Sequence, residues 1–471
     1  MPLASAPLTL REKLAFGCGD FASVLYWQTF MRYLPFFYTD VFGLSAAALA
    51  TMLLLSRIWD AIDDPVIGMV ADRTETRWGK FRPYILFGCV PFAFAGVLAF
   101  TTPEMGATGK LIWAYVTYNV LMVMYTVVNI PYTALLGVLT RDTVERTRLS
   151  SIKFIFAFSA GTLVSATLLP LVKVLGGDSP QRGWQLAFCV YGAVAVLFFL
   201  VTGFFTRERV TPVRERNVSI LGDLRLLITN RPWLLLLATT LTLILFYAIR
   251  SSVSTHYFKY YLYAGQPDRE LTFLGYSFTL EALVSTFNTV GQATSILGVV
   301  LVGVLAHRVR RKPLFIGLFL VSVASTACYY ILTPGNLSAI FLVEFASSIS
   351  GAPLSVLLWA MYADTADFGE WKSGRRTTAL VFSASSMSQK FGWALAAYLA
   401  FKMLSLGGFV ANVTPTAEVQ SVLVLLMSII PAGLGLISIG IFLFYPLTED
   451  RMATIHADLN ARRLGSPSAV S

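Results

Sequence analysis

The chain has 471 residues, enough for two or three soluble domains, but 56% of them are hydrophobic and only 13% are charged. Ordinary soluble enzymes carry about 25% charged residues, so this composition excludes that class. The net charge of +10 does not indicate a nucleic-acid partner, because the basic residues are scattered among short loops and form no single face. The composition predicts an all-α polytopic membrane protein that contacts the lipid bilayer.

Apolar runs bounded by polar residues predict twelve transmembrane helices. Each span needs about 20 apolar residues, so twelve spans use roughly 240 residues. In chain order the expected spans are 14–38, 45–70, 83–101, 111–137, 150–172, 184–205, 232–254, 282–306, 314–333, 337–361, 377–404 and 421–446. We expect the first span to be retained, because no small-residue cleavage site follows it.

Most basic residues lie in alternate loops and near the two chain ends. Lys and Arg accumulate on the cytoplasmic side of membrane proteins, so both termini are predicted to be cytoplasmic. The longest charged loop then separates two sets of six spans. We expect an N-terminal six-helix bundle at 1–206, a cytoplasmic linker at 207–231, a C-terminal six-helix bundle at 232–447 and a cytoplasmic tail at 448–471.

A short repeat supports this division. Residues 68–73 (G-M-V-A-D-R) follow span 2, and residues 303–308 (G-V-L-A-H-R) follow span 8. Internal repeats are typical of transporters in which two bundles rock against each other. A chance match of common loop residues is the alternative.

Span 2 contains three carboxylates. Asp60 and Asp64 are four residues apart and lie on one helix face. Two like charges repel unless a cation or a proton lies between them, and hard cations such as Na⁺ prefer oxygen ligands. We interpret the pair as a cation site, with Asp63 beside it. The alternative is that Arg57 neutralises the set, or that Asp63 and Asp64 already lie in the cytoplasmic interface.

Span 1 carries Asp20, with Trp27 seven residues later on nearly the same face. A buried carboxylate beside an aromatic ring suits a sugar, whose hydroxyls need acceptors and whose C–H face stacks on a ring. A lipid-facing Trp27 is the alternative. In span 4, Thr126 and Asn129 lie one turn apart beside Pro131, so their oxygens are candidates to complete the cation site; a proline kink bridged by its own neighbours is the alternative.

Two further lysines lie within spans. Lys153, at the start of span 5, either snorkels to the cytoplasmic surface or faces the interior. Lys390 lies too deep in span 11 to snorkel easily, and we expect it to face a central cavity. The segment 255–281 is interpreted either as an extracellular extension of span 7 that contributes to selectivity or as an amphipathic surface helix.

The cysteines and histidines argue against disulfides, metal sites and enzymatic chemistry. The four cysteines, Cys18, Cys89, Cys189 and Cys328, lie in apolar stretches without a C-x-x-C pair, so we expect free, buried thiols and no disulfide or zinc site. The three histidines have no metal-ligand spacing, and no nucleophile motif or phosphate loop is present. We therefore expect no enzyme, no cofactor and no transition metal.

At these positions the chain resembles the glycoside–pentoside–hexuronide:cation symporters, the melibiose permease branch of the major facilitator superfamily. The resemblance rests on residues 37–45 (F-Y-T-D-V-F-G-L-S), 57–65 (R-I-W-D-A-I-D-D-P), 72–73 (D-R), 77–83 (R-W-G-K-F-R-P), 125–126 (Y-T), 129–131 (N-I-P) and 363–370 (A-D-T-A-D-F-G-E). It covers both halves of the chain.

This resemblance implies Na⁺- or H⁺-coupled sugar or glycoside uptake across a bacterial inner membrane by a monomer with two six-helix bundles. Asp60, Asp64 and Thr126 match cation-site positions, whereas Asp20, Trp27 and Lys390 match sugar-site positions. Tyr125 and Lys153 are assigned to the sugar site as well. The implied cytoplasmic gate consists of Asp72, Arg73, Arg77, Lys80, Asp364 and Asp367, with Arg146 or Arg148 as the basic partners of the last two.

Several positions depart from the family pattern. Asn129 replaces an aspartate of the cation site, and Asp63 replaces an asparagine, so the choice between Na⁺ and H⁺ stays open. Thr133 and Ser355 stand where the melibiose permease branch has tryptophans, and Lys153 is close to, but out of register with, its basic sugar-binding residue. A second reading keeps the fold with an amphiphile such as a lysolipid as cargo, and a membrane-embedded enzyme or a sensor is a remote third.

Overall fold

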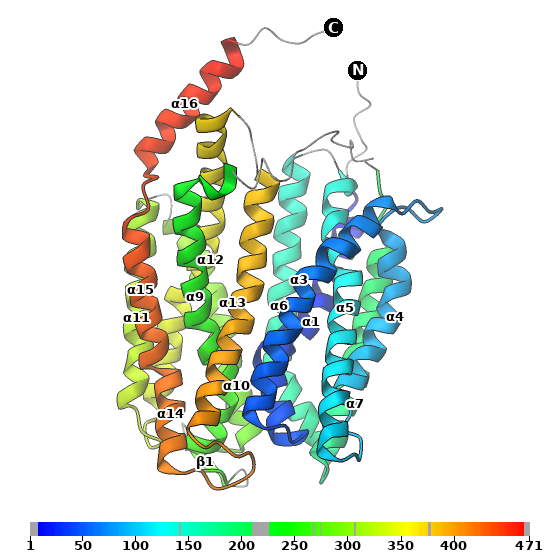
Figure 1. The fold of residues 1–471 in the computed structure, drawn as a ribbon, viewed down its shortest axis with the longest axis vertical. Helices are drawn as coiled ribbons and strands as arrows, with labels where there is room; N and C mark the ends of the chain where they lie inside the picture. Colours follow the sequence, from blue (N-terminus) through cyan, green and yellow to red (C-terminus); the bar gives the residue numbers. More distant parts are fainter. Residues whose placement is uncertain are drawn as a thin grey trace. The chain divides into compact units, whose positions relative to one another are not determined.

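The computed structural model describes residues 8–140, 143–209, 226–266, 269–273, 275–305, 308–374 and 378–465. Figure 1 shows the path of the chain through its helices. In the first half they are α1 (Leu10–Arg32), α2 (Leu34–Phe36), the π-helical η1 (Phe37–Val41), α3 (Ala46–Arg73), α4 (Arg82–Ala99), α5 (Ala107–Leu139), α6 (Thr143–Gly176) and α7 (Pro180–Phe205).

The second half contains further helices and one short hairpin. Its elements are α9 (Arg231–His256), the π-helical η2 (Tyr257–Leu262), β1 (Leu271–Phe273), β2 (Tyr276–Phe278), α10 (Leu280–Leu305), α11 (Arg311–Cys328), η3 (Tyr329–Ile331), α12 (Leu337–Ser373), α13 (Thr378–Leu406), α14 (Ala417–Met427), α15 (Ile429–Leu443) and α16 (Glu449–Gly465). Each of the twelve predicted spans coincides with helix in the described residues, and nine helices there are long and apolar enough to cross a membrane.

The helix boundaries follow from local chemistry. Thr9 caps α1 by accepting the Glu12 N–H, while the Glu12 carboxylate accepts the Thr9 N–H, so two otherwise unpaired donors are satisfied. Ser45 caps α3 through the Ala48 N–H. Some helices extend past the expected spans, and α12 continues to Ser373, about three turns beyond the predicted end at residue 361.

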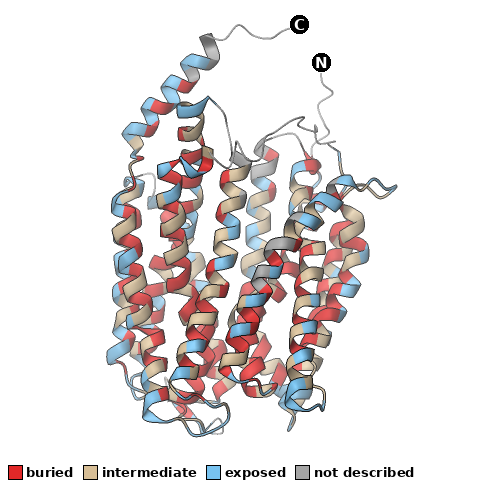
Figure 2. Ribbon diagram, viewed as in Figure 1, coloured by how far each residue is buried: buried red, intermediate tan, exposed pale blue. Residues whose placement is uncertain are grey.

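The outer faces of several helices are apolar. On α4, Phe87, Val90 and Phe94 are 64%, 57% and 63% exposed and share one helix face. Figure 2 shows exposed and buried residues on different sides of the same helices. Such an exposed apolar stripe suits hydrocarbon as the surrounding solvent. The expectation of buried thiols is therefore wrong for Cys189 and Cys328, which are free but exposed; sequence hydropathy does not distinguish a core-facing from a lipid-facing position.

The chain divides into two compact units. The first combines Met1–Arg214 with Ser251–Gln292 and Ala397–Leu423, and the second contains Glu215–Arg250, Ala293–Ala396 and Val424–Ser471. The predicted domain boundaries at 206, 231 and 447 stay a prediction, and most of the predicted linker lies outside the described residues.

In the first unit, spans 1 and 7 end in the same way. The Phe42 N–H donates to the Phe37 carbonyl at the end of η1, and the Tyr263 N–H donates to the Phe258 carbonyl at the end of η2. The next residue has a positive φ in both places, +89° at Gly43 and +53° at Ala264. The matching backbone turns agree with an internal duplication.

The segment that follows span 7 differs from a surface helix. Residues 257–262 extend α9 as η2, and β1 then pairs antiparallel with β2, with Leu271 opposite Phe278. The amphipathic-helix interpretation is therefore wrong for the described part of 255–281. Aromatic residues at strand positions favour the hairpin.

The second unit has its own core. Phe246 of α9, Phe315 and Phe319 of α11, Tyr362 of α12 and Phe442 of α15 are all buried. In the predicted tail, α16 buries a stripe of apolar residues, Met452, Ile455 and Leu459. The Trp371 indole N–H donates to Asp458 over 2.9 Å, which holds α16 against the end of α12.

Candidate functional site

The centre of the first unit contains an ion pair between two transmembrane helices. Lys153 Nζ of α6 lies 3.5 Å from Asp20 Oδ1 of α1, and the two side chains are 26% and 12% exposed. The same ammonium group lies 5.8 Å from the centre of the Tyr132 ring. Lys153 thus reaches inward to the carboxylate predicted for the sugar site. Together the pair offers hydrogen-bond acceptors and donors in an apolar region.

The predicted aromatic partner lies on the same helix. Trp27 is half-buried and stacks on Tyr125 of α5, with ring centroids 5.8 Å apart and planes inclined by 26°. Phe30 and Phe92 lie at 6.5 Å and 6.0 Å from the same tyrosine ring. Both rings are half-buried, so the sugar-site role of Trp27 stays a prediction, with a lipid-facing indole as the alternative.

A glycine next to Asp20 allows the helices to approach closely. The Tyr132 ring lies where a side chain at position 19 would project, because a Cβ on Gly19 would come within 2.4 Å of it. The Tyr132 hydroxyl donates to the Phe16 carbonyl over 3.0 Å, and the Tyr132 ring stacks on Phe16 at 5.1 Å. This contact sets the distance between α1 and α5 beside Asp20, and the sequence interpretation missed it.

The predicted cation residues lie on α3 and α5. Asp60 and Asp63 are buried, and Asp64 is half-buried. The Thr126 hydroxyl donates to Asp64 Oδ1 over 3.1 Å, so two of the predicted oxygen donors are in contact. The Arg57 side chain lies outside the described residues, so its neutralising role stays a prediction.

The chemistry of these donors fits a small hard cation. Carboxylate and hydroxyl oxygens are the ligands that such ions prefer. The backbone carbonyl of Asn129 accepts a hydrogen bond from the Thr133 hydroxyl over 2.9 Å, one turn further along α5. Among the described residues no three His, Cys, Asp or Glu side chains converge as a metal-binding group. A bound cation would therefore use the Thr126 hydroxyl or backbone oxygens in addition to the carboxylates.

The remaining predicted residues are distributed over both units. Lys390 is half-buried on α13 in the second unit. Arg73 and Arg77 are exposed, and Lys80 is half-buried. The side chains of Asp72 and Arg146 lie outside the described residues.

The predicted gate residues have partners inside their own units. Arg148 pairs with Glu145 at 2.8 Å. Asp364 pairs with Arg311 at 3.0 Å, and Asp367 with His456 of α16 at 3.2 Å. The pairing of Arg146 or Arg148 with the two aspartates stays a prediction.

Glu208, after α7, is a structural residue that the sequence interpretation missed. Its carboxylate accepts three backbone N–H groups at the start of α4, from Lys80, Phe81 and Arg82, over 2.8–3.1 Å. The carboxylate approaches through the space at Gly79, which has φ +107° and no side chain. A negative charge at a helix N-terminus stabilises the helix.

A larger missed cluster joins residues from distant parts of the first unit. Lys259 Nζ of η2 donates to Asp40 Oδ1 of η1 over 2.7 Å and to Asn412 Oδ1 over 2.6 Å. The Tyr260 hydroxyl also donates to Asp40, and His256 Nε2 lies 3.3 Å from Asp40 Oδ2. The Asp40 side chain is only 1% exposed.

The charges in this cluster compensate for burial. The Asp40 carboxylate accepts from the Lys259 ammonium and the Tyr260 hydroxyl at Oδ1, and from the Thr39 hydroxyl at Oδ2 over 2.7 Å. The opposite charge of Lys259 and these hydrogen bonds offset the cost of burying the carboxylate. Asp40 belongs to the stretch F-Y-T-D-V, on which the family resemblance partly rests, but no sequence pattern pairs it with Lys259.

The second unit has a comparable ion pair. Arg250 of α9 pairs with Glu344 of α12 and donates to Ser347 and Thr326 over 2.9 Å and 3.1 Å. The Tyr329 hydroxyl donates to the same Glu344 carboxylate over 3.1 Å. This network joins α9, α11 and α12, and the sequence interpretation does not identify it.

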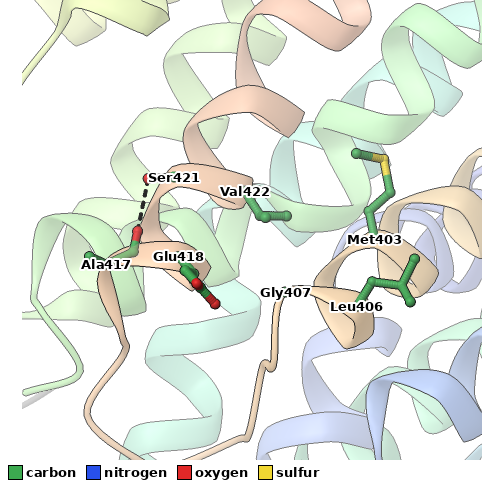
Figure 3. Close-up of a pocket in the computed structure, with 7 residues that line it drawn as sticks. All are labelled: Met403, Leu406, Gly407, Ala417, Glu418, Ser421 and Val422. Carbon is green, nitrogen blue, oxygen red and sulfur yellow. Dashed lines mark hydrogen bonds between the residues drawn. The ribbon is translucent and has the colours of Figure 1, made fainter.

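A shallow surface cavity of about 560 Å³ lies between the end of α13 and the start of α14 (Figure 3). Its lining is mostly apolar and consists of Met403, Leu406, Gly407, Ala417, Glu418, Ser421 and Val422. It shares no residue with the Asp20 or Asp60 regions.

Comparison with known proteins identifies the family of the chain. Residues 15–449 match the family described as MFS/sugar transport protein. The chain is 34% identical to the inner membrane symporter YicJ of Escherichia coli K12, over 97% of this chain and 96% of the relative. It is 33% identical to the putative glycoside/cation symporter YagG of the same strain (98% and 97% covered) and 34% identical to the isoprimeverose transporter of Lactiplantibacillus pentosus (93% and 89%).

Solved structures match at the level of the fold. An inward-facing bacterial homolog of the human lysosomal transporter Spinster superposes with a TM-score of 0.66 at 14% identity, covering 98% of each chain. A D-xylose-proton symporter superposes with a TM-score of 0.61 at 12% identity, covering 93% of this chain and 97% of its own. The predicted major facilitator fold is confirmed, and the matched families are transporters. The chain belongs to the MFS/sugar transport protein family, as a member of its glycoside–pentoside–hexuronide:cation symporter group.

Proposed function

We propose that the protein is a secondary active transporter that couples the movement of Na⁺ or H⁺ to uptake of a sugar or glycoside by alternating access. The relatives described as a glycoside/cation symporter and an isoprimeverose transporter support this class of cargo. We also propose that both termini lie in the cytoplasm, on one side of a bacterial inner membrane, because the positive-inside rule predicts this from the basic loops. The chain works as a monomer in this proposal.

The observation that carries the proposal is the position of two neighbours on α5. Tyr125 stacks on Trp27 of the sugar-site residues, and Thr126, the next residue, donates to Asp64 of the cation-site residues. A single turn of helix thus contacts both groups of side chains. Any shift of α5 that accompanies binding at one group is transmitted directly to the other.

The chemistry assigns a role to each group. Asp20 accepts hydrogen bonds from sugar hydroxyls, Lys153 donates to them, and Trp27 offers its face to the C–H side of the ring. A cation between Asp60 and Asp64 neutralises carboxylates that are costly to leave charged within a membrane. If cation binding stabilises the geometry that also fits sugar, each ligand raises the affinity for the other by the same factor.

Counterflow in proteoliposomes tests the sugar-site assignment. The probes are radiolabelled mono- and disaccharides, including α- and β-glycosides and uronic acids. We expect wild-type exchange of at least one sugar and loss of most of that exchange in the Asp20→Asn and Lys153→Gln variants. Lys402→Gln, which changes an exposed lysine, is the matched control. Wild-type exchange rates in both site variants would contradict the assignment.

A further inference from the structure

Two amide side chains converge on a glycine near the proposed sugar site. Gln28 of α1 and Gln292 of α10 both approach Gly161 of α6: a Cβ on Gly161 would lie 3.2 Å from Gln292 Nε2 and 3.9 Å from Gln28 Cδ. Both glutamines are half-buried, and neither amide has a hydrogen-bond partner among the described residues. Their hydrogen-bonding capacity is therefore available to a ligand.

The two amides lie further along α1 and α6 than the Asp20–Lys153 pair does. Gln28 follows Asp20 by eight residues on α1, and Gly161 follows Lys153 by eight residues on α6. At a rise of about 1.5 Å per residue, both helices place the second group about 12 Å further along their axes. Trp27, which stacks on Tyr125, lies directly before Gln28. Where α1 packs against α6, polar side chains thus lie at two levels, and the Trp27 ring lies beside the second level.

Other contacts fix α10 at this level. Arg32 donates to Asn288 Oδ1 over 2.9 Å, and Asn288 Nδ2 donates to the Tyr33 hydroxyl over 2.9 Å. Arg32 and Asn288 are each one helical turn from the corresponding glutamine. These bonds set the register of α10 against α1, so the position of Gln292 is defined by packing and by hydrogen bonds.

The two levels differ in chemistry. The Asp20–Lys153 level is charged, whereas the second level presents neutral amides, each with a donor and an acceptor. Hydroxyl groups have the same dual character. The axial spacing of about 12 Å between the two levels leaves room for a ligand longer than one pyranose ring. Because Gly161 has no side chain, the Gln292 and Gln28 amides can both lie close to the α6 backbone at this level.

We propose that Gln28, Gln292 and Gly161 form a second sugar subsite, which makes a two-ring glycoside the preferred substrate over a single ring. This subsite rests on the proposed function. The first ring binds at Asp20 and Lys153, and the amides bind hydroxyls of the second ring. Because Gln292 belongs to the second half of the chain, the second ring contacts both halves.

Calorimetric titration of the purified transporter with matched sugar pairs tests the subsite. The pairs are methyl β-glucoside with cellobiose, methyl β-xyloside with xylobiose, and methyl α-galactoside with melibiose. We expect wild type to bind one disaccharide more tightly than its methyl glycoside. Gln28→Leu and Gln292→Leu should each weaken that disaccharide about 2- to 10-fold, the value of one lost hydrogen bond, and change the methyl glycoside less than about 2-fold.

Two further variants make the result specific. Gly161→Val displaces the Gln292 amide without removing it and should also weaken only the disaccharide. Gln181→Leu, on the exposed start of α7, should change neither sugar. Equal weakening of both members of a pair, or unchanged disaccharide binding in all three site variants, would overturn the subsite while leaving sugar transport intact. Absence of binding of every sugar to wild type would overturn the subsite and the proposed function together.

Discussion

Replacing Lys259 by methionine tests the buried Asp40 cluster. The ion pair is among the least exposed in the described residues, with side chains 9% and 1% exposed at Lys259 and Asp40. Removing one partner of a buried pair leaves the other charge uncompensated and costs about 3–5 kcal/mol. Tyr260 and Thr39 still donate to Asp40 in the variant, so we expect the lower end, about 3 kcal/mol.

The assay is the free energy of unfolding in detergent, measured by denaturant titration as a double-mutant cycle. Lys259→Met alone should lose about 3 kcal/mol, and Asp40→Asn together with Lys259→Met should lose less than the single variant, because no buried charge is left unpaired. Lys402→Met is the control, because Lys402 is exposed on α13. Loss below about 0.5 kcal/mol in Lys259→Met, or an equal loss in the control, would show that the Asp40–Lys259 pair does not stabilise the fold.

Two substitutions test structural details near the proposed sites, each by denaturant titration. Gly19→Ala should destabilise the protein by about 1–3 kcal/mol and weaken sugar binding, because the new methyl group collides with Tyr132. Its control, Gly137→Ala, has open space around it and should stabilise the protein by about 0.5–1 kcal/mol. Glu208→Ala should destabilise the protein by about 1–3 kcal/mol, because three N–H groups at the start of α4 lose their acceptor, whereas its control, Glu104→Ala in an exposed loop, should cost less than about 0.5 kcal/mol. Unchanged stability in Gly19→Ala or in Glu208→Ala would contradict the corresponding contact.

The helices were predictable because each span can be recognised from its own run of apolar residues. A run of about 20 apolar residues bounded by charges needs no partner to be recognised, and all twelve expected spans coincide with helix. Ionisable residues inside those runs also identified Asp20 and Lys153 individually. Their 3.5 Å contact, however, depends on how α1 packs against α6, which no local period encodes.

The contacts that sequence missed are long-range ones. Lys259 and Asp40 are 219 residues apart, and Glu208 is 126–128 residues from the N–H groups that it caps. Lys259 is basic, near a span end and indistinguishable by composition from a topology-setting loop residue. Sequence also gives no sign that Gly19 matters, because its role depends on the Tyr132 ring that packs beside it. Sequence periodicity assigns residues to helices, but partner choice depends on tertiary packing.

The most direct test of the account is the effect of the coupling ion on sugar affinity. The dissociation constant of a sugar bound by wild type is measured with and without Na⁺ at pH 6 and pH 8, and again in the Thr126→Ala and Thr133→Ala variants. If transport is cation-coupled, Na⁺ or the lower pH tightens sugar binding in wild type and in Thr133→Ala. Thr126→Ala, which loses its bond to Asp64, should reduce this effect. Sugar affinity that is independent of both Na⁺ and pH in wild type would contradict cation coupling.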